Sequence, residues 1–313
     1  MHHVTAEEAQ ILLDYPGLIA ALHAAHAADL HPDTYRDIRE DQNANAFVSL
    51  LSWADQDVIA VKMVGVFPGN PGLKPPQPSV QGLVLLFDGK TGRPLMTADG
   101  AELTFRKTAA DSALGASFLA RQDVRTLLVC GAGGLAPHVI AAHRTVRPGL
   151  SRVLIWNRSP ARAKALAESI SVDAEIAAID DLDAALPEAD VISCVTMATE
   201  PIVRGALLKP GAHVDLIGAY QPQMRESDDA TIRRAGRIFL DTRLFCERSG
   251  DIAEPLARGI ITREGLVADL FDLCCGRHRG RKSAAEITVY KNSGGGHLDL
   301  FTARHLYARI MAG

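Results

Sequence analysis

The sequence predicts an α/β protein with two parts, a Rossmann-type dinucleotide-binding domain and an α+β domain. Its 313 residues suffice for roughly two domains. Residues 1–118 contain strand-like runs with hairpin signals, whereas short apolar strands alternate with helices from residue 119 onward. A glycine-rich loop from Gly131 to Ala136 directly follows one of these strands and opens a helix.

The first part begins with a helix and continues as an antiparallel sheet. Thr5 and Glu8 have the spacing of a capping box, and apolar residues at helical spacing follow as far as Leu22. Strands are expected at residues 46–53, 58–67, 81–87 and 94–96, with a Pro- and Gly-rich loop at 68–78. An Asp-Gly turn precedes the last of these strands.

The second part has the alternation of a parallel sheet with helical crossovers. After a small-residue helix at 109–121, we expect strands at 126–130, 152–156, 191–195, 213–217 and 237–240. Helices are expected at 135–144, 160–169 and 227–235, and the chain closes with a strand at 287–290 and a helix at 299–311. The predicted domains are therefore 1–118 with 295–313, and 119–294.

Composition excludes several classes of partner. The net charge is −4 with no basic stripe, so neither nucleic acid nor an anionic membrane is expected. No apolar run approaches the roughly 20 residues of a membrane span. Five cysteines, two of them adjacent, form no disulfide framework, and they predict a reducing cytoplasmic location. No Cys/His spacing indicates a metal site.

The glycine-rich loop predicts a dinucleotide site. Gly131 permits the tight turn, Gly133 lets the backbone approach the pyrophosphate, and Ala136 occupies the third motif position. Gly134 and Leu135 complete the loop, whose exposed N–H groups at a helix start favour phosphate. The alternative interpretation is an ordinary glycine-rich turn between a strand and a helix.

The residues after the second strand of this domain favour NADP(H), with NAD(H) as the other possibility. An acidic residue there would bind the ribose hydroxyls of NAD, whereas an arginine accommodates the 2′-phosphate of NADP. This chain has Asn157, Arg158 and Ser159, followed by Arg162, and no acid at the tip. The alternative is that both arginines belong to a solvated helix start.

Several cations are candidates for a substrate site. Lys62 stands in an apolar strand, where burial of an unpaired charge is costly, although one exposed face of an antiparallel sheet would also explain it. Arg106 and Lys107 precede the small-residue helix, where a cation opposes the helix dipole and suggests an anionic ligand. A surface basic pair explains them equally well. Arg36 and Arg39 lie in a polar stretch.

The ordered motifs of the chain resemble the ornithine cyclodeaminase/mu-crystallin family from about residue 30 to the C-terminus. The segments that carry the resemblance are 61–64, 67–70, 82–88, 103–104, 108–110, the Gly131 loop, 200–202, 210–214, 225–226, 287–291 and 299–300. The resemblance implies a Rossmann domain and an α+β domain that binds substrate and forms a homodimer. It also implies hydride transfer between a nicotinamide and the α-carbon of a small amino or imino acid.

The resemblance assigns residues to both ligands. It implies that Lys62 and Ser79 hold the substrate carboxylate with an N-terminal arginine, either Arg36 or Arg39. The family's helix-start arginine falls at Lys107, with Arg106 one residue earlier, and lysine keeps the charge but lacks the planar fork. Further cofactor contacts are expected from four residues: Thr108, Val195, Thr196 and Gly218.

One departure from the family pattern concerns the reaction itself. Ornithine cyclodeaminases carry an aspartate in a Gly-x-Asp-x-Pro pattern, and Tyr220 occupies that position between Gly218 and Pro222. Tyrosine, with a reference pKa of about 10, is a poor base at neutral pH, although it can donate a proton or pack on a ring. With Lys62, it is our candidate catalytic residue.

The sequence therefore favours an NADPH-dependent imino acid (ketimine) reductase. Three alternatives remain open: an ornithine cyclodeaminase that forms proline and ammonia, an amino-acid dehydrogenase of the alanine type, and a non-catalytic NADPH-binding protein.

Overall fold

The computed structural model describes residues 1–43 and 45–313 and divides the chain into two compact units. Unit 1 comprises Met1–Lys107 and Gly295–Gly313, and unit 2 comprises Thr108–Gly294. The expected combination of a Rossmann-type domain with an α+β domain is confirmed. The domain boundary expected at residue 118 stays a prediction. Among the described residues, no helix has the length and apolar character needed to cross a membrane.

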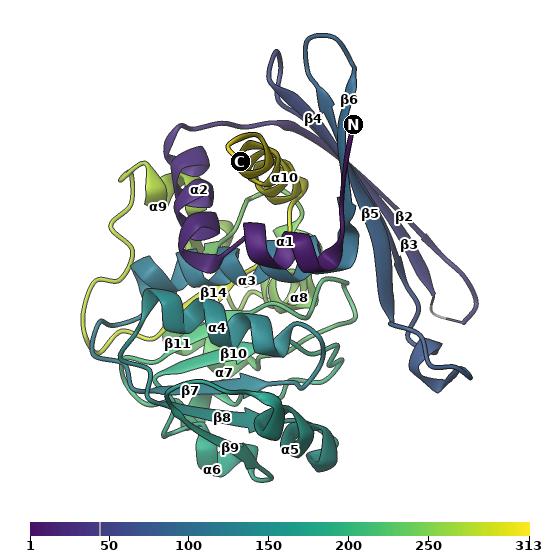
Figure 1. Cartoon of the computed structure of the whole chain (residues 1–313). Helices are drawn as coiled ribbons and strands as arrows, with labels where there is room; N and C mark the ends of the chain where they lie inside the picture. The colour runs from purple at the N-terminus through teal and green to yellow at the C-terminus, as the bar shows by residue number, and fades with distance from the viewer. Residues whose placement is uncertain (44) are drawn as a thin grey trace. The chain divides into compact units, whose positions relative to one another are not determined.

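Unit 1 is built on a six-stranded sheet in the order β1-β6-β5-β4-β3-β2, shown in Figure 1. Neighbouring strands are antiparallel except β1, which pairs with β6 in parallel. The strands are β1 (His2–Val4), β2 (Asp33–Glu40), β3 (Ala46–Trp53), β4 (Val58–Val66), β5 (Val80–Asp88) and β6 (Pro94–Asp99).

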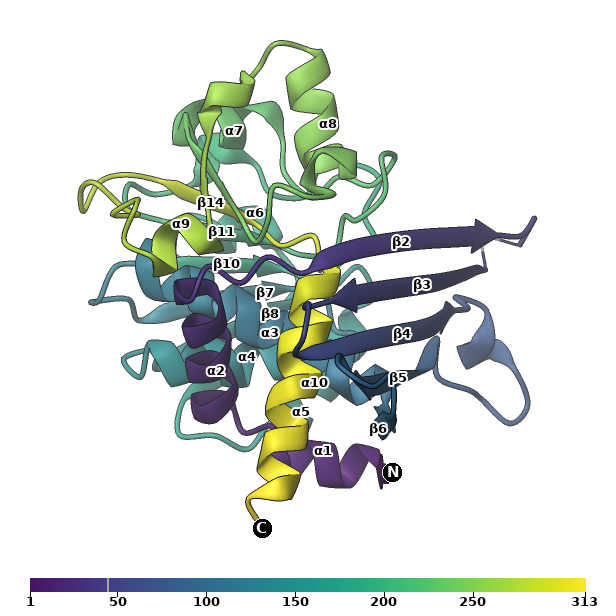
Figure 2. The same cartoon turned by 90° about the horizontal axis from the view of Figure 1, so that it is seen from above.

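One face of this sheet is covered by the C-terminal helix α10 (Gly296–Met311), which contacts β3, β4 and β5. Figure 2 shows α10 crossing the strands. Val48, Leu50 and Val64 form an apolar cluster on the strands' buried positions. The helices α1 (Ala6–Leu12) and α2 (Tyr15–Ala27) contact α10. Thr5 caps α1 through the expected capping box with Glu8.

Strand β2 was not expected from the sequence. Its residues alternate between exposed and half-buried positions, and it lies at the edge of the sheet, where polar side chains are tolerated. The helix expected from residue 109 also starts earlier, because α3 runs over Gly100–Leu119. The Asp99 carboxylate accepts the N–H of Glu102 over 2.8 Å, which caps the new first turn.

Unit 2 is an eight-stranded parallel sheet in the order β13-β12-β14-β11-β10-β7-β8-β9. From β7 the chain proceeds outward through β8 and β9, then returns to place β10 on the other side of β7. The strands are β7 (Thr126–Cys130), β8 (Arg152–Trp156), β9 (Glu175–Ile179), β10 (Val191–Cys194), β11 (His213–Leu216), β12 (Ile238–Leu240), β13 (Leu266–Asp269) and β14 (Thr288–Lys291).

Helices connect these strands. They are α4 (Ala136–Val146), α5 (Pro160–Ser169), α6 (Leu182–Ala185), α7 (Asp229–Ala235), α8 (Gly250–Ala257) and α9 (Leu270–Cys274). Strands β9 and β13 and helices α6, α8 and α9 were not expected from the sequence. These elements are short, so their hydrophobic periodicity is weak.

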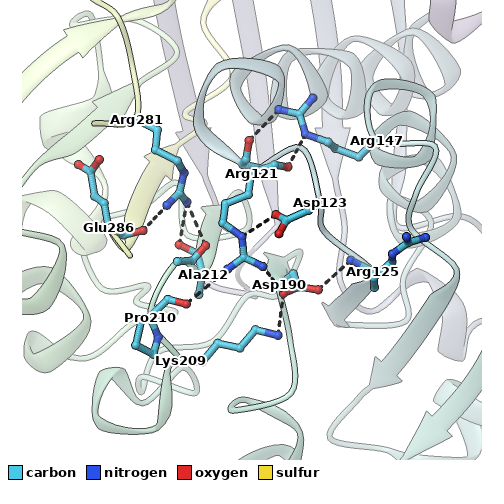
Figure 3. A network of polar contacts seen from close by, with 12 residues as sticks. Arg121, Asp123, Arg125, Arg147, Asp190, Lys209, Pro210, Ala212, Arg281 and Glu286 are labelled. Atoms are coloured by element: carbon cyan, nitrogen blue, oxygen red, sulfur yellow. Dashed lines mark hydrogen bonds and ion pairs between the residues drawn. The ribbon is translucent and has the colours of Figure 1, made fainter. Parts of the chain in front are cut away.

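Charged side chains form hydrogen bonds and ion pairs at the amino ends of the strands of unit 2, as Figure 3 shows. Arg147 donates to the carbonyls of Ala116, Ser117 and Ala120 and so satisfies the end of α3. The Asp190 carboxylate, just before β10, accepts the main-chain N–H groups of Arg125 and Thr126. This network stabilises the sheet at the amino ends of its strands, opposite the carboxyl ends where the crevice lies.

Candidate active site

The reversal of strand order between β7 and β10 places a crevice at the carboxyl ends of these strands, where open α/β sheets bind their ligands. Gly131 follows β7 directly and has a φ of +118°, a conformation that side chains rarely adopt. A Cβ on Gly131 would also lie 2.9 Å from the carbonyl oxygen of Val195, the residue after β10. Only glycine fits at this position.

A cavity of about 530 Å³ opens at this crevice. Seven of the residues that we expected to bind the cofactor line it: Gly131, Gly133, Asn157, Arg158, Arg162, Val195 and Thr196. The sequence did not single out its other lining residues: Ala132, Trp156, Met197, Ala198, Thr199, Glu200 and Ile202. Most of these follow β10 as a loop; Ala132, Glu200 and Ile202 stood in recognised motifs, but they had no assigned role at the cofactor.

The glycine-rich loop fits a dinucleotide. A Cβ on Gly133 would meet no atom within 4 Å, so the backbone there is open to a ligand. Asn157 fixes the loop, because its Oδ1 accepts the N–H of Ala132 over 3.2 Å and its Nδ2 donates to the carbonyl of Ser159. Helix α4 starts at Ala136 directly behind the loop, with no side-chain cap on its first N–H groups. These groups favour a phosphate.

Arg158 and Arg162 are exposed side chains on the wall of this cavity. Ser159 caps α5 by position, without a side-chain cap hydrogen bond, and does not line the cavity. Gly134, Leu135 and Ala136 are not among the lining residues; Leu135 is the N-cap of α4 and Ala136 its first residue. Thr108 is buried, and its carbonyl accepts the side-chain amide of Asn292 over 3.0 Å.

The loops after β10 and β11 are joined by one buried carboxylate. A Cβ on Gly218 would lie 1.8 Å from the carbonyl oxygen of Thr196, so the two backbones approach as closely as glycine permits. Glu226 accepts the N–H of Thr196 over 2.7 Å and that of Gly218 over 2.8 Å. The sequence assigned Gly218 and Thr196 to the cofactor, whereas Glu226 stood in a family motif without an assigned role.

In unit 1, two buried lysines converge on one carboxylate. The Nζ atoms of Lys62, on β4, and Lys107, on α3, each lie 3.0 Å from Oδ1 of Asp299, on α10. All three side chains are at most 6% exposed. Burial lowers the pKa of Lys62 to about 8; the charge of Lys107 also lowers it, whereas Asp299 raises it and offsets part of the shift. Lys62 therefore does not point to water.

Arg106 and Lys107 have separate roles. Arg106 Nε donates to Glu102 over 2.7 Å, its Nη1 donates to the carbonyl of Leu13, and its guanidinium lies over the Tyr15 ring. These contacts tie α3 to the α1–α2 connection. Of the two neighbours, Lys107 is thus the one that the structure brings to Lys62.

Strand register distinguishes the two N-terminal arginines. Arg36 pairs with Leu50, and Leu50 pairs with Lys62, so these three side chains share the face that α10 covers. Arg39 lies on the opposite face, and its Nε donates to Asp37 at an exposed position. The structure therefore places Arg36, and not Arg39, on the same face as the lysines.

Ser79 lies away from the lysine cluster within unit 1, and Tyr220 belongs to the other unit. Ser79 immediately precedes β5, five positions along the chain from Val84, which pairs with Lys62. At about 3.3 Å per residue, this places Ser79 roughly 16 Å along the strand. Tyr220 lies in unit 2 and follows β11, half-buried, with Ala219 held by the hydroxyl of Ser249 and Gln221 by the N–H of Gly250. The assignment of Ser79 to the substrate and that of Tyr220 to catalysis stay predictions.

Comparisons with known proteins agree with this architecture. The model of the ornithine cyclodeaminase/mu-crystallin family matches residues 9–313. A Delta(1)-pyrroline-2-carboxylate reductase from Paracoccus denitrificans is 42% identical over 305 residues, which cover 96% of this chain and 94% of that protein.

Solved structures show the same fold. The Delta(1)-pyrroline-2-carboxylate reductase of Thermococcus litoralis, in complex with NADH and L-proline, superposes with a TM-score of 0.93 at 28% identity, covering 100% of this chain and 98% of that one. The iminosuccinate reductase of Paracoccus denitrificans, in complex with NAD⁺, gives a TM-score of 0.87 at 27% identity, with 100% and 97% covered. The chain belongs to the ornithine cyclodeaminase/mu-crystallin family.

Proposed function

We propose that this chain is an NAD(P)H-dependent reductase of small imino acids, with a cyclic imine such as pyrroline-2-carboxylate as its substrate. The observation that carries the proposal is the pair of buried lysines on Asp299. The Nζ atoms of Lys62 and Lys107 both lie 3.0 Å from the same oxygen of Asp299, so two buried ammonium groups stand side by side. Ammonium groups in this arrangement suit the carboxylate of a substrate, because charge-assisted hydrogen bonds are strong in a buried place.

The chemistry needs no protein nucleophile. The bound nicotinamide supplies a hydride, which adds to the imine carbon and breaks the C=N π bond, while the nitrogen takes a proton; the cofactor is oxidised and an amino acid results. Lys62 suits the role of proton donor, because with a pKa of about 8 it carries a proton at neutral pH yet releases it more readily than an ordinary lysine. Lys107 holds the carboxylate, which is a positioning effect.

The cofactor that we propose is NADP(H) in preference to NAD(H). Arg158 and Arg162 both line the cavity beside the glycine-rich loop, and arginine matches the geometry of a phosphate. The solved relatives named above hold NADH and NAD⁺, so NAD(H) is the alternative cofactor.

We propose that the chain forms a homodimer through the face of its six-stranded sheet opposite α10. Large apolar side chains are exposed on this outer face: Tyr35, Phe47, Trp53, Met63 and Leu83, whose exposed fractions run from 42 to 67%. The register sets Met63 opposite Leu83, so these two apolar side chains are neighbours on β4 and β5. Such a patch on a folded protein marks an interaction surface. A cytoplasmic location stays a prediction from the cysteines.

The test is an assay of the purified chain with NADPH or NADH and three imines: pyrroline-2-carboxylate, piperideine-2-carboxylate and iminosuccinate. We expect cofactor oxidation and formation of proline from the first. If none of the three imines causes oxidation of the cofactor, the proposal is contradicted. Ammonia release from ornithine would indicate a cyclodeaminase. Net formation of NAD(P)H from alanine would indicate a dehydrogenase, and tight NADPH binding without turnover would indicate a binding protein.

A further inference from the structure

A buried carboxylate lies directly behind the cofactor cavity and is not used by the chemistry above. Glu226 belongs to the segment between β11 and α7 and is fully buried. Its Oε1 accepts the N–H and the hydroxyl of Thr196, both over 2.7 Å. Its Oε2 accepts the N–H of Gly218 over 2.8 Å and that of Ala219 over 3.3 Å. The carboxylate therefore receives four donors from two loops.

The main chain of the same segment forms hydrogen bonds with other residues of the loop after β10, which lines the cavity. The carbonyl of Glu226 accepts the N–H groups of Ile202 and Val203, both over 2.9 Å, and the N–H of Arg225 donates to the carbonyl of Ala198 over 2.7 Å. Ala198 and Ile202 line the cavity, as does Thr196. The loop after β10 is thus attached to residues 225–226 at both of its ends.

Glu226 is fixed in turn by a buried ion pair. Asp251, on α8, accepts the N–H groups of Glu226 and Ser227, over 2.9 and 3.2 Å. Lys291, at the end of β14, donates to the other oxygen of Asp251 over 3.3 Å. Both members of the pair are fully buried. Asp251 and Lys291 are the charged groups that face Glu226, and the Cys194 thiol of β10 adjoins it.

We propose that Glu226 is a positioning residue for the nicotinamide cofactor, because its carboxylate holds the loops at Thr196 and Gly218 in the arrangement that borders the cofactor. The proposal rests on the cofactor requirement of the proposed function. Burial is costly for a carboxylate, and the negative charge of Asp251 adds to that cost, so a residue that merely filled this space would better be neutral.

The ionisation of Glu226 gives a distinctive readout. Burial, followed by the charge of Asp251, raises the pKa of Glu226 to about 7, whereas Lys291 and the hydrogen bonds from Thr196 lower it and limit the rise. When Glu226 gains a proton, one oxygen becomes a donor and faces other donors, so the loops lose an acceptor. Cofactor affinity should therefore fall as the pH falls through about 7.

The experiment compares the dissociation constant of NADPH and of NADH in wild type and in Glu226→Gln from pH 5.5 to 8.5, measured by quenching of protein fluorescence in the full chain. Glutamine keeps the size but presents an NH₂ to the N–H groups of one loop. We expect Glu226→Gln to bind cofactor about tenfold more weakly at pH 8 and to lose the wild-type dependence near pH 7. Titration of the NADPH 2′-phosphate would persist in the variant and is absent with NADH.

Two further variants complete the test. Thr196→Val removes a single hydroxyl donor and should weaken binding in the same direction but less, which keeps the proposal testable should Glu226→Gln not fold. Asp190→Asn alters a buried carboxylate at the amino ends of the strands, away from the cofactor cavity at their carboxyl ends, and should leave cofactor affinity unchanged. The proposal is overturned by wild-type affinity in Glu226→Gln, by a pH dependence of NADH binding that survives in that variant, by equal weakening in Asp190→Asn, or by no cofactor binding at all. Because binding is measured without turnover, inactivity toward imino acids would contradict only the proposed function.

Discussion

Lys62 Nζ lies 3.0 Å from Asp299 Oδ1, and the two residues are 237 positions apart in the chain. Lys107 contacts the same oxygen, so one carboxylate arranges both cations. The other oxygen, Oδ2, is buried and accepts no hydrogen bond from a described residue. Asp299 thus keeps the two lysines together.

Replacing Lys62 by methionine should lower kcat/KM for pyrroline-2-carboxylate by about 10²- to 10³-fold, because the proposed proton donor to the imine nitrogen is lost. The dissociation constant of NADPH should stay within about twofold, since Lys62 belongs to unit 1 and the cofactor cavity is lined by unit 2. Steady-state kinetics and fluorescence quenching separate the two effects. An unchanged kcat/KM would show that Lys62 is not part of the active site.

The pH dependence of the reaction should report the Lys62–Asp299 pair. Lys62 has a pKa of about 8, so activity that requires its ammonium should fall as the pH rises through about 8. The negative charge of Asp299 raises that pKa, so Asp299→Asn should move the alkaline decline to lower pH. Asp57→Asn is the matched control, because it removes an exposed ion pair between Asp57 and Arg304 of α10. Equal profiles for all three proteins would exclude Lys62 as the titrating group.

Arg158→Gln should reduce kcat/KM with NADPH about tenfold and leave the value with NADH nearly unchanged. The reason is that Arg158 lines the cavity where we place the 2′-phosphate, which NADH lacks. Arg152→Gln, at the other end of β8, should change neither value. A wild-type enzyme that clearly prefers NADH would contradict the cofactor assignment.

The outer sheet face can be tested by a charge placed within it. Trp53→Glu should convert the dimer to a monomer in size-exclusion chromatography with light scattering, because burial of an unpaired carboxylate in an apolar interface is costly. Leu244→Glu, which alters an exposed apolar residue of unit 2, should remain dimeric. A monomeric wild type, or a Trp53→Glu dimer of undiminished stability, would show that the dimer does not use this face.

Tyr220 predicts the absence of one activity. A phenol with a reference pKa of about 10 does not act as a base on the ornithine amine at neutral pH. Wild type with NAD⁺ or NADP⁺ should therefore release no ammonia from L-ornithine in a coupled glutamate dehydrogenase assay. Stoichiometric ammonia would show that the aspartate of the family pattern is dispensable here.

The sequence predicted what depends on local patterns. The Gly131 loop follows a buried strand and opens a helix, and the structure shows this arrangement because only glycine fits against Val195. Strand β2 escaped prediction because an edge strand with charged residues has no apolar alternation. As a result, the sequence left Arg36 and Arg39 equivalent, and only the pairing with β3 placed them on opposite faces.

Side-chain contacts between residues that are distant in the sequence could not be predicted from local patterns. Asp299 stood in a recognised motif, but nothing local indicated that it faces Lys62 and Lys107. The separation of Arg106 from Lys107 likewise depends on Glu102 and Leu13, which only the packing of α3 reveals. Glu226 was also part of a motif, but its four donors come from loops that meet only in the folded sheet.

The most direct test of the central claim is the fate of the cofactor's hydrogen. Wild type should be incubated with pyrroline-2-carboxylate and NADPH that carries deuterium at both C4 positions of the nicotinamide, and the proline should be analysed by mass spectrometry and NMR. Transfer to the imine carbon predicts one deuterium per proline, located at Cα. Proline without deuterium at Cα, or no proline from an otherwise cofactor-binding enzyme, would contradict the account.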